Sequence, residues 1–105
     1  MELEALPHPS GKRHRGPARR RVAYQSPSDA TSIGVSEWNP GEWPYATTEP
    51  EFCQILSGCA TFMPDGGEPM PLKAGGAILM HPGTVGCWIV VEALRRLSLT
   101  LPRIS

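Results

Sequence analysis

The chain has 105 residues, which is enough for one small domain and excludes a two-domain enzyme with an inter-domain cleft. Its net charge is zero, but residues 1–21 carry six basic and two acidic side chains, whereas residues 22–105 carry four basic and eight acidic ones. This acidic body argues against a nucleic-acid partner. Eleven glycines and twelve prolines leave little room for long helices and favour an all-β sandwich or barrel.

The N-terminal segment differs from the rest of the chain. Residues 1–20 show neither apolar periodicity nor a strand pattern, so we expect a flexible basic arm, followed by a folded domain over residues 21–105. No apolar run approaches the roughly 20 residues of a membrane span. The basic segment also lacks the apolar stretch of a secretory signal, so neither a membrane nor a secreted location is expected.

Short strand-like runs follow the arm, and turn-forming residues separate them. The prolines of residues 69–73 restrict that run to a sheet edge. Residues 77–80 are apolar throughout, so this strand is expected to be buried. No segment shows helical periodicity over three turns. The predicted strands are 21–24, 32–38, 51–56, 59–63, 69–73, 77–80, 85–91 and 94–101.

The number and spacing of the cysteines indicate the cellular compartment in which the protein folds. There are three, an odd number, and none belongs to a Cys-x-x-Cys pair. This pattern argues against a disulfide scaffold and a structural zinc site, and it suits a reducing cytoplasm.

Four segments in chain order resemble one known family. They read GVSEWNPGEW, TEPEFCQILSG, KAGGAILMHPGTVGCW and VEALRR. The string is similar to the small single-domain cupins of the (S)-ureidoglycine aminohydrolase-like type. The resemblance implies a cupin-type double-stranded β-helix, which is a small jelly-roll barrel with the site in its open mouth.

The resemblance also raises the question of a metal centre. Cupins at large hold a divalent metal with three histidines and one glutamate. When the two cupin motifs are anchored on Gly58 and Gly75, the glutamate falls on Glu51. One carboxylate cannot hold a transition metal at useful affinity, so no metal cofactor is expected. The three histidine positions fall on residues without a ligand atom: Pro44, Ala46 and Gly86.

A rearranged ligand set is the alternative. Glu49, Glu51 and Cys53 are spaced by two and would share one face of a strand. His81 lies at a predicted rim turn and would have to reach inward. Such a set would suit a metal-dependent enzyme that acts on a small nitrogen-containing metabolite, as the family name suggests.

Without a metal, Glu51 is the candidate general acid or base of the cavity. The tryptophans would either stack on a ligand or fill the core. Tyr45 would fill the space that a metal occupies in other cupins. Arg95 and Arg96 are adjacent in a strand, so one should point inward, where it would pair with Glu51 or bind a substrate carboxylate. The predicted pocket residues are Trp38, Trp43, Tyr45, Cys53, His81, Trp88 and Arg95.

Three functions therefore stay open. The first is a cupin that binds a small metabolite, with weak acid/base catalysis by Glu51. The second is the metal-dependent enzyme, and the third is a non-catalytic structural or interaction protein. We expect a homodimer, because a small jelly roll gains by pairing its exposed sheet edges, with strands of the N-terminal region contributing to the interface.

Overall fold

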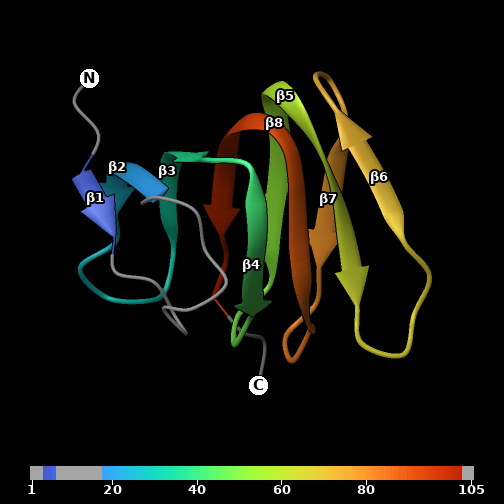
Figure 1. Ribbon diagram of the computed structural model, residues 1–105. Helices are drawn as coiled ribbons and strands as arrows, with labels where there is room; N and C mark the ends of the chain where they lie inside the picture. The colour runs from blue at the N-terminus through green and yellow to red at the C-terminus, as the bar shows by residue number, and fades with distance from the viewer. Residues whose placement is uncertain (1–3, 7–17, 103–105) are drawn as a thin grey trace.

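The computed structural model describes residues 4–6 and 18–102 (Figure 1). Within them the chain forms only strands and connecting turns, which confirms the all-β prediction. The eight strands are β1 (Glu4–Leu6), β2 (Ala18–Gln25), β3 (Ser32–Trp38), β4 (Gly41–Ala46), β5 (Glu51–Pro64), β6 (Met70–Lys73), β7 (Ala77–Met80) and β8 (Val85–Thr100).

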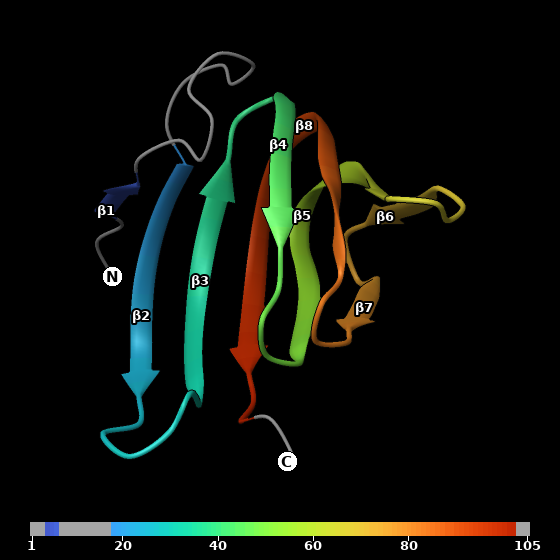
Figure 2. The ribbon, with the colours of Figure 1, turned by 90° about the horizontal axis from the view of Figure 1, so that it is seen from below.

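Two long strands, β5 and β8, organise the sheet. They pair with each other over nearly their whole length, and each takes different partners at its two ends. The first part of β5 pairs with β7, and the last part of β8 pairs with β3. The second part of β5 pairs with β6, and the first part of β8 pairs with β4. Figure 2 shows β1, β2 and β3 at one side of the molecule and β6 and β7 at the other.

The two long strands change register together where they bend. Gly58 has a φ of 87°, and a Cβ atom there would lie 2.1 Å from the carbonyl oxygen of Ala93. The sequence predicted a strand end at this point of both strands. The structure shows instead that the strands continue through a bend, because a glycine lets the two backbones approach closely.

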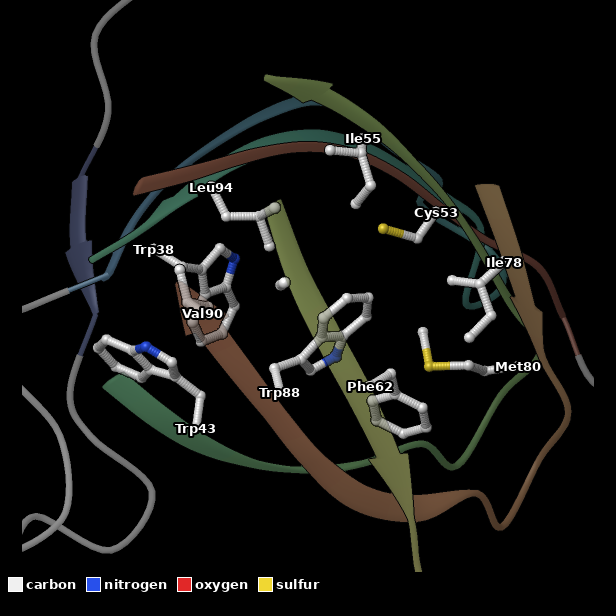
Figure 3. Close-up of a cluster of buried hydrophobic side chains, with 11 residues drawn as sticks. Trp38, Trp43, Cys53, Ile55, Phe62, Ile78, Met80, Trp88, Val90 and Leu94 are labelled. Carbon is white, nitrogen blue, oxygen red and sulfur yellow. The ribbon is translucent and has the colours of Figure 1, made fainter. Parts of the chain in front are cut away.

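The core lies between the two halves of the folded sheet (Figure 3). Alternate residues of the paired strands point into it, as the period of two requires. The buried apolar side chains are Trp38, Trp43, Cys53, Ile55, Ala60, Phe62, Ile78, Met80, Trp88, Val90 and Leu94.

Two predictions about individual strands need correction. Residues 77–80 were expected to be buried, but only Ile78 and Met80 are, while Leu79 is 53% exposed because alternate side chains of β7 point to its outer face. Strand β4 was missed altogether, since Pro44 and the turn signal before it hid the pattern. Pro44 is tolerated because β4 has only one partner strand in the described part of the chain, β8. The edge position predicted for residues 69–73 is confirmed by β6, which ends the strand order.

The predicted arm contains ordered strands. β1 and the first residues of β2 fall within residues 1–20, and Arg19 and Arg20 pair with β3. The remaining arm residues, 1–3 and 7–17, lie outside the described residues. The division into an arm and a barrel domain stays a prediction.

Candidate functional site

The floor of the candidate site is the inner face of β2, β3 and β8, extended by the start of β5. Side chains in cross-strand register form three rows on this face. Gly34 lies in the middle row and contributes no side chain. The rows are Arg20, Ser36 and Arg96; then Val22, Gly34 and Ser98; then Ser32, Thr100 and Glu51.

A cavity of about 220 Å³ lies over this floor. Trp38 of β3 and Tyr45 of β4 complete its wall. The volume equals that of about seven water molecules in the liquid. This is room for a small metabolite. Because the wall carries three charged side chains and several hydroxyls, the cavity suits a polar ligand.

A cluster of three polar side chains stands in the wall. The Tyr45 hydroxyl lies 2.7 Å from both carboxylate oxygens of Glu51, to which it donates. Arg96 donates through Nη2 to the Tyr45 oxygen at 3.4 Å, and the same nitrogen is 4.0 Å from Glu51 Oε2. Arg96 is 3% exposed and Glu51 is 8% exposed. The three strands β4, β5 and β8 thus meet in one buried, charge-balanced cluster.

The Arg96 guanidinium lies among three aromatic rings. Its Cζ atom is 5.0 Å from the ring centre of Trp38, 5.1 Å from that of Tyr45 and 4.8 Å from that of Trp88. Such contacts attract a cation and replace part of its lost hydration. Nε and Nη1 of Arg96 have no oxygen or nitrogen partner within hydrogen-bond distance in the described part of the chain, while the Ser98 hydroxyl and the Arg96 guanidinium both interact with the Cys53 thiol. Unpaired buried donors are costly, so the site is not optimised for stability alone.

Burial and charge shift the pKa values of this cluster. Burial raises the pKa of Tyr45 to about 12, and the effect is opposed by Arg96 and assisted by Glu51. The phenol is therefore protonated at neutral pH and can donate to Glu51. Burial also raises the pKa of the Cys53 thiol, which makes it a poor nucleophile. For Arg96, burial favours the neutral form, but Tyr45, Cys53 and Glu51 outweigh it and raise the pKa.

The Tyr45 shift predicts a loss of stability at alkaline pH. A pKa near 10 in the unfolded chain and about 12 in the folded one gives stability that is complete below pH 10 and is lost as the pH rises through 12. The loss amounts to about 2–3 kcal/mol. Urea unfolding between pH 9 and 12 would measure it. The Tyr45→Phe variant should lack this component, and an identical pH dependence in both proteins would contradict the assignment.

The predicted site residues fall into three places. Trp38, Tyr45 and Glu51 line the cavity. Trp43, Cys53 and Trp88 belong to the core. His81 is exposed at a turn, where its carbonyl oxygen accepts from the Thr47 and Thr84 hydroxyls. Glu49 lies in a loop beside Thr48, to which it is hydrogen-bonded.

The arginine of the site is Arg96 and not Arg95, which corrects the prediction. Arg95 lies on the outer face, where it donates to Glu37 at 2.5 Å. The prediction that one of the pair points inward was right, but alternation alone does not say which one. Arg20, Ser36 and Ser98 were also missed. Arg20 had been assigned to the arm, and serines in a strand carry no distinctive signal.

The residues present do not fit the cupin metal centre. At Gly86, one of the three expected histidine positions, a Cβ atom would lie 2.4 Å from the Met63 carbonyl oxygen, so no side chain fits. The Glu51 carboxylate already accepts a hydrogen bond from the Tyr45 hydroxyl. In the described residues, no three His, Cys, Asp or Glu side chains gather as a metal site would require. The alternative set of Glu49, Glu51, Cys53 and His81 is therefore not brought together.

Residues 25–97 match the EutQ-like cupin domain family. The chain belongs to this family. It is thus a small cupin, and the jelly-roll prediction is confirmed, whereas the narrower ureidoglycine aminohydrolase-like assignment is not. No curated protein matches the sequence significantly.

Solved structures of low sequence identity share the fold. The ethanolamine utilization protein EutQ of Salmonella typhimurium superposes with a TM-score of 0.75 at 16% identity, over 96% of this chain and 94% of that one. EutQ of Clostridium difficile superposes with a TM-score of 0.80 at 13% identity, over 97% of this chain and 81% of that one. A predicted oxalate decarboxylase of Thermotoga maritima superposes with a TM-score of 0.78 at 17% identity, over 96% of this chain and 92% of that one.

No helix of the described residues is long and apolar enough to span a membrane.

Proposed function

We propose that this cupin binds a small polar metabolite in the cavity of its barrel, without a three-histidine metal centre. The observation that carries the proposal is the buried Tyr45–Glu51–Arg96 cluster in the cavity wall. A protein with apolar side chains of similar volume in place of a buried ion pair is often equally stable or more stable. A polar cluster that faces a cavity is therefore better explained by ligand recognition than by packing.

Glu51 is the proposed reactive group of the site. Its carboxylate ends at the cavity wall, and Tyr45 donates to it from the side. A carboxylate held in this way can accept a hydrogen bond from a ligand hydroxyl or amine, and it can relay a proton through the phenol. We propose binding as the main activity and weak acid/base catalysis by Glu51 as its extension.

The experiment is a screen of small metabolites by ligand-observed NMR, followed by titration of each hit. Glu51→Gln is expected to weaken binding about tenfold or more, because a hydrogen bond to a charged group is lost in a buried site. Glu42→Gln removes the same charge from an exposed position of β4 and should leave binding unchanged. Equal affinities for wild type and Glu51→Gln would contradict the proposed site, and a screen without hits would contradict the function.

The two other functions predict different results. A metal-dependent enzyme acting on a nitrogen-containing metabolite requires a stoichiometric metal that is lost in Glu51→Gln, which elemental analysis of untagged protein would detect. A purely structural cupin requires that no small molecule bind the cavity. The wall cluster gives no support to either alternative.

We also propose a homodimer formed through the outer face of the sheet. One apolar row crosses five strands there, with Tyr24, Ile33, Leu99, Phe52 and Leu79 in register. Leu79 is 53% exposed, Tyr24 51% and Phe52 38%. Five strands make a face about 20 Å wide. A two-fold axis would stack the row on the same row of a second copy.

Sedimentation equilibrium tests the dimer. The wild type is expected to sediment as a dimer and Leu79→Lys as a monomer, because a charge buried within an apolar contact is not compensated. Lys73→Glu, on β6 and away from the row, is the control. A monomeric wild type would exclude the dimer.

The three cysteines are free thiols, which agrees with the proposed cytoplasmic location.

A further inference from the structure

A second hollow lies on the half of the sheet where β5 runs between β8 and β6. It is a groove of about 440 Å³, twice the volume of the cavity over the inner face, and no residue lines both. A volume of this size is typical of small-molecule sites. The groove is lined by Cys59, Ala60 and Thr61 of β5, Pro71, Leu72 and Lys73 of β6, and Val91 of β8.

The alternation of the strands places this groove on the outer face of the sheet. Ala60 belongs to the core, so the flanking residues Cys59 and Thr61 face outward. Their register partners on β6, Lys73 and Pro71, face the same way. Because β6 ends the strand order, no further strand of the described chain pairs with its outer edge. The groove is therefore separate from the barrel interior and open to a ligand from solution.

The walls of the groove include exposed apolar side chains. Val91 is 64% exposed, more than any other large hydrophobic side chain of the described residues. Pro71 is exposed as well and lies on the opposite wall. A ligand that covers these side chains would remove apolar surface from water, which favours binding of a molecule with an apolar part.

One charged side chain lines the groove, that of Lys73. Neither salt bridge of the described residues involves it. The acid in the same row is Glu92, on the far side of Cys59, and its carboxylate accepts from the Cys59 thiol at 3.2 Å. Glu4, whose side chain is not described, belongs to β1, which lies at the opposite side of the molecule from β6 (Figure 2), and Glu2 precedes it by two residues. The charge that lines the groove is thus positive.

A hydroxyl group lies within reach of the same ammonium. Lys73 is directly opposite Cys59, so Thr61 is its diagonal neighbour, and a long side chain spans that separation. A carboxylate between the two would accept a charge-assisted hydrogen bond from the ammonium and a second bond from the hydroxyl. Glu92 does not line the groove, so an amine bound there would meet Lys73 without a carboxylate to receive it.

We infer that this groove is a second binding site, for a small amphipathic carboxylate, and that Lys73 binds its carboxylate group. The apolar chain or ring of the acid lies against Val91 and Pro71. The site is additional to the metabolite cavity and does not rest on the function proposed for it. A free acid fits better than an anionic membrane, because lipid-binding surfaces carry clusters of about four to eight basic residues and this groove carries one.

The test compares acids with neutral molecules of the same shape. The probes are hexanoate, heptanoate and octanoate, each with its primary amide, together with hexylammonium and vesicles of phosphatidylserine and phosphatidylcholine, titrated by calorimetry. Affinity is expected to rise up to about fourfold for each added methylene. Each acid should bind about two- to fivefold more tightly than its amide, as for an ion pair near the surface. Amide NMR signals of residues 70–73 should shift on binding, and those of residues 32–36 should not.

Three variants assign the contributions. Lys73→Gln should abolish the preference for acid over amide and keep the dependence on chain length. Arg21→Gln removes the same charge from an exposed position of β2 and should retain the preference. Val91→Ser shortens the apolar wall and should weaken acid and amide alike. All three side chains are exposed, so thermal unfolding should stay close to that of the wild type.

The outcomes leave the metabolite cavity to its own test. The inference is wrong if the amides bind as tightly as the acids, if hexylammonium binds more tightly than hexanoate, or if Lys73→Gln behaves like Arg21→Gln. It is equally wrong if no acid binds, if only the vesicles bind, or if octanoate shifts residues 32–36 instead of 70–73. None of these results bears on the binding of a polar metabolite beside Glu51.

Discussion

Replacing Arg96 with methionine is expected to lower the free energy of unfolding by about 3–5 kcal/mol. The side chain is 3% exposed, so the substitution leaves the Glu51 carboxylate buried with Tyr45 as its one hydrogen-bond partner among the described residues. An uncompensated buried charge is the main reason for the loss. The three rings that surround the guanidinium also lose a cation that contacts each of them. Urea unfolding monitored by tryptophan fluorescence measures the change.

Three further variants test the cause of that loss. Arg95→Met removes the same charge from the outer face, where exposed pairs contribute at most about 1 kcal/mol. The double variant Glu51→Gln/Arg96→Met should recover much of the loss, since no buried charge remains. Arg96→Lys keeps the charge but not the planar group, and it should lie between wild type and Arg96→Met. If Arg96→Met is no less stable than Arg95→Met, the cluster does not stabilise the fold as described.

Replacing Gly58 with alanine is expected to cost at least about 2 kcal/mol, for two reasons. The residue has a φ of 87°, which an L-residue adopts only at a cost of about 1–2 kcal/mol. The new methyl group would also lie 2.1 Å from the Ala93 carbonyl oxygen, so β8 must move away from β5 at the bend. For a domain of this size, each kcal/mol lowers the melting temperature by about 4–8 °C.

Gly75 provides the matched control for this experiment. Its φ is 91°, but a Cβ atom there would have no neighbour within 4 Å. Gly75→Ala therefore carries the backbone cost without the collision, and differential scanning calorimetry of the two variants separates the two contributions. Equal melting temperatures for Gly58→Ala and Gly75→Ala would show that the close approach at the bend adds nothing.

The sequence predicted regular strands well where alternation was clean. Residues 32–38 were placed with their observed bounds, because apolar and small residues alternate there without interruption. The bend at Gly58 could not be read, since a glycine after a serine is equally typical of a turn. Strand β4 depends on its pairing with β8, and no local pattern around Pro44 reveals that contact.

The site was predicted in part for similar reasons. Alternation along β8 divides its residues between two faces but does not say which face is inside. Leu97 and Leu99 lie on the outer face of β8, and Arg96 lies inside. Arg20 reaches the cavity only because β2 pairs with β3, and this long-range contact leaves no trace in residues 1–20. The roles of Trp38, Tyr45 and Glu51 stay predictions.

The shared strand β8 has a consequence for how the protein folds. It is the last strand of the described chain, and it pairs with β3, β4 and β5. A growing chain that ends before residue 85 lacks the strand that joins both halves of the sheet. Its apolar strands would then remain exposed until synthesis has passed β8, so folding must begin late and depend on distant pairings. Ribosome-bound chains that stop at residue 84 are therefore expected to be sensitive to protease and to bind chaperones.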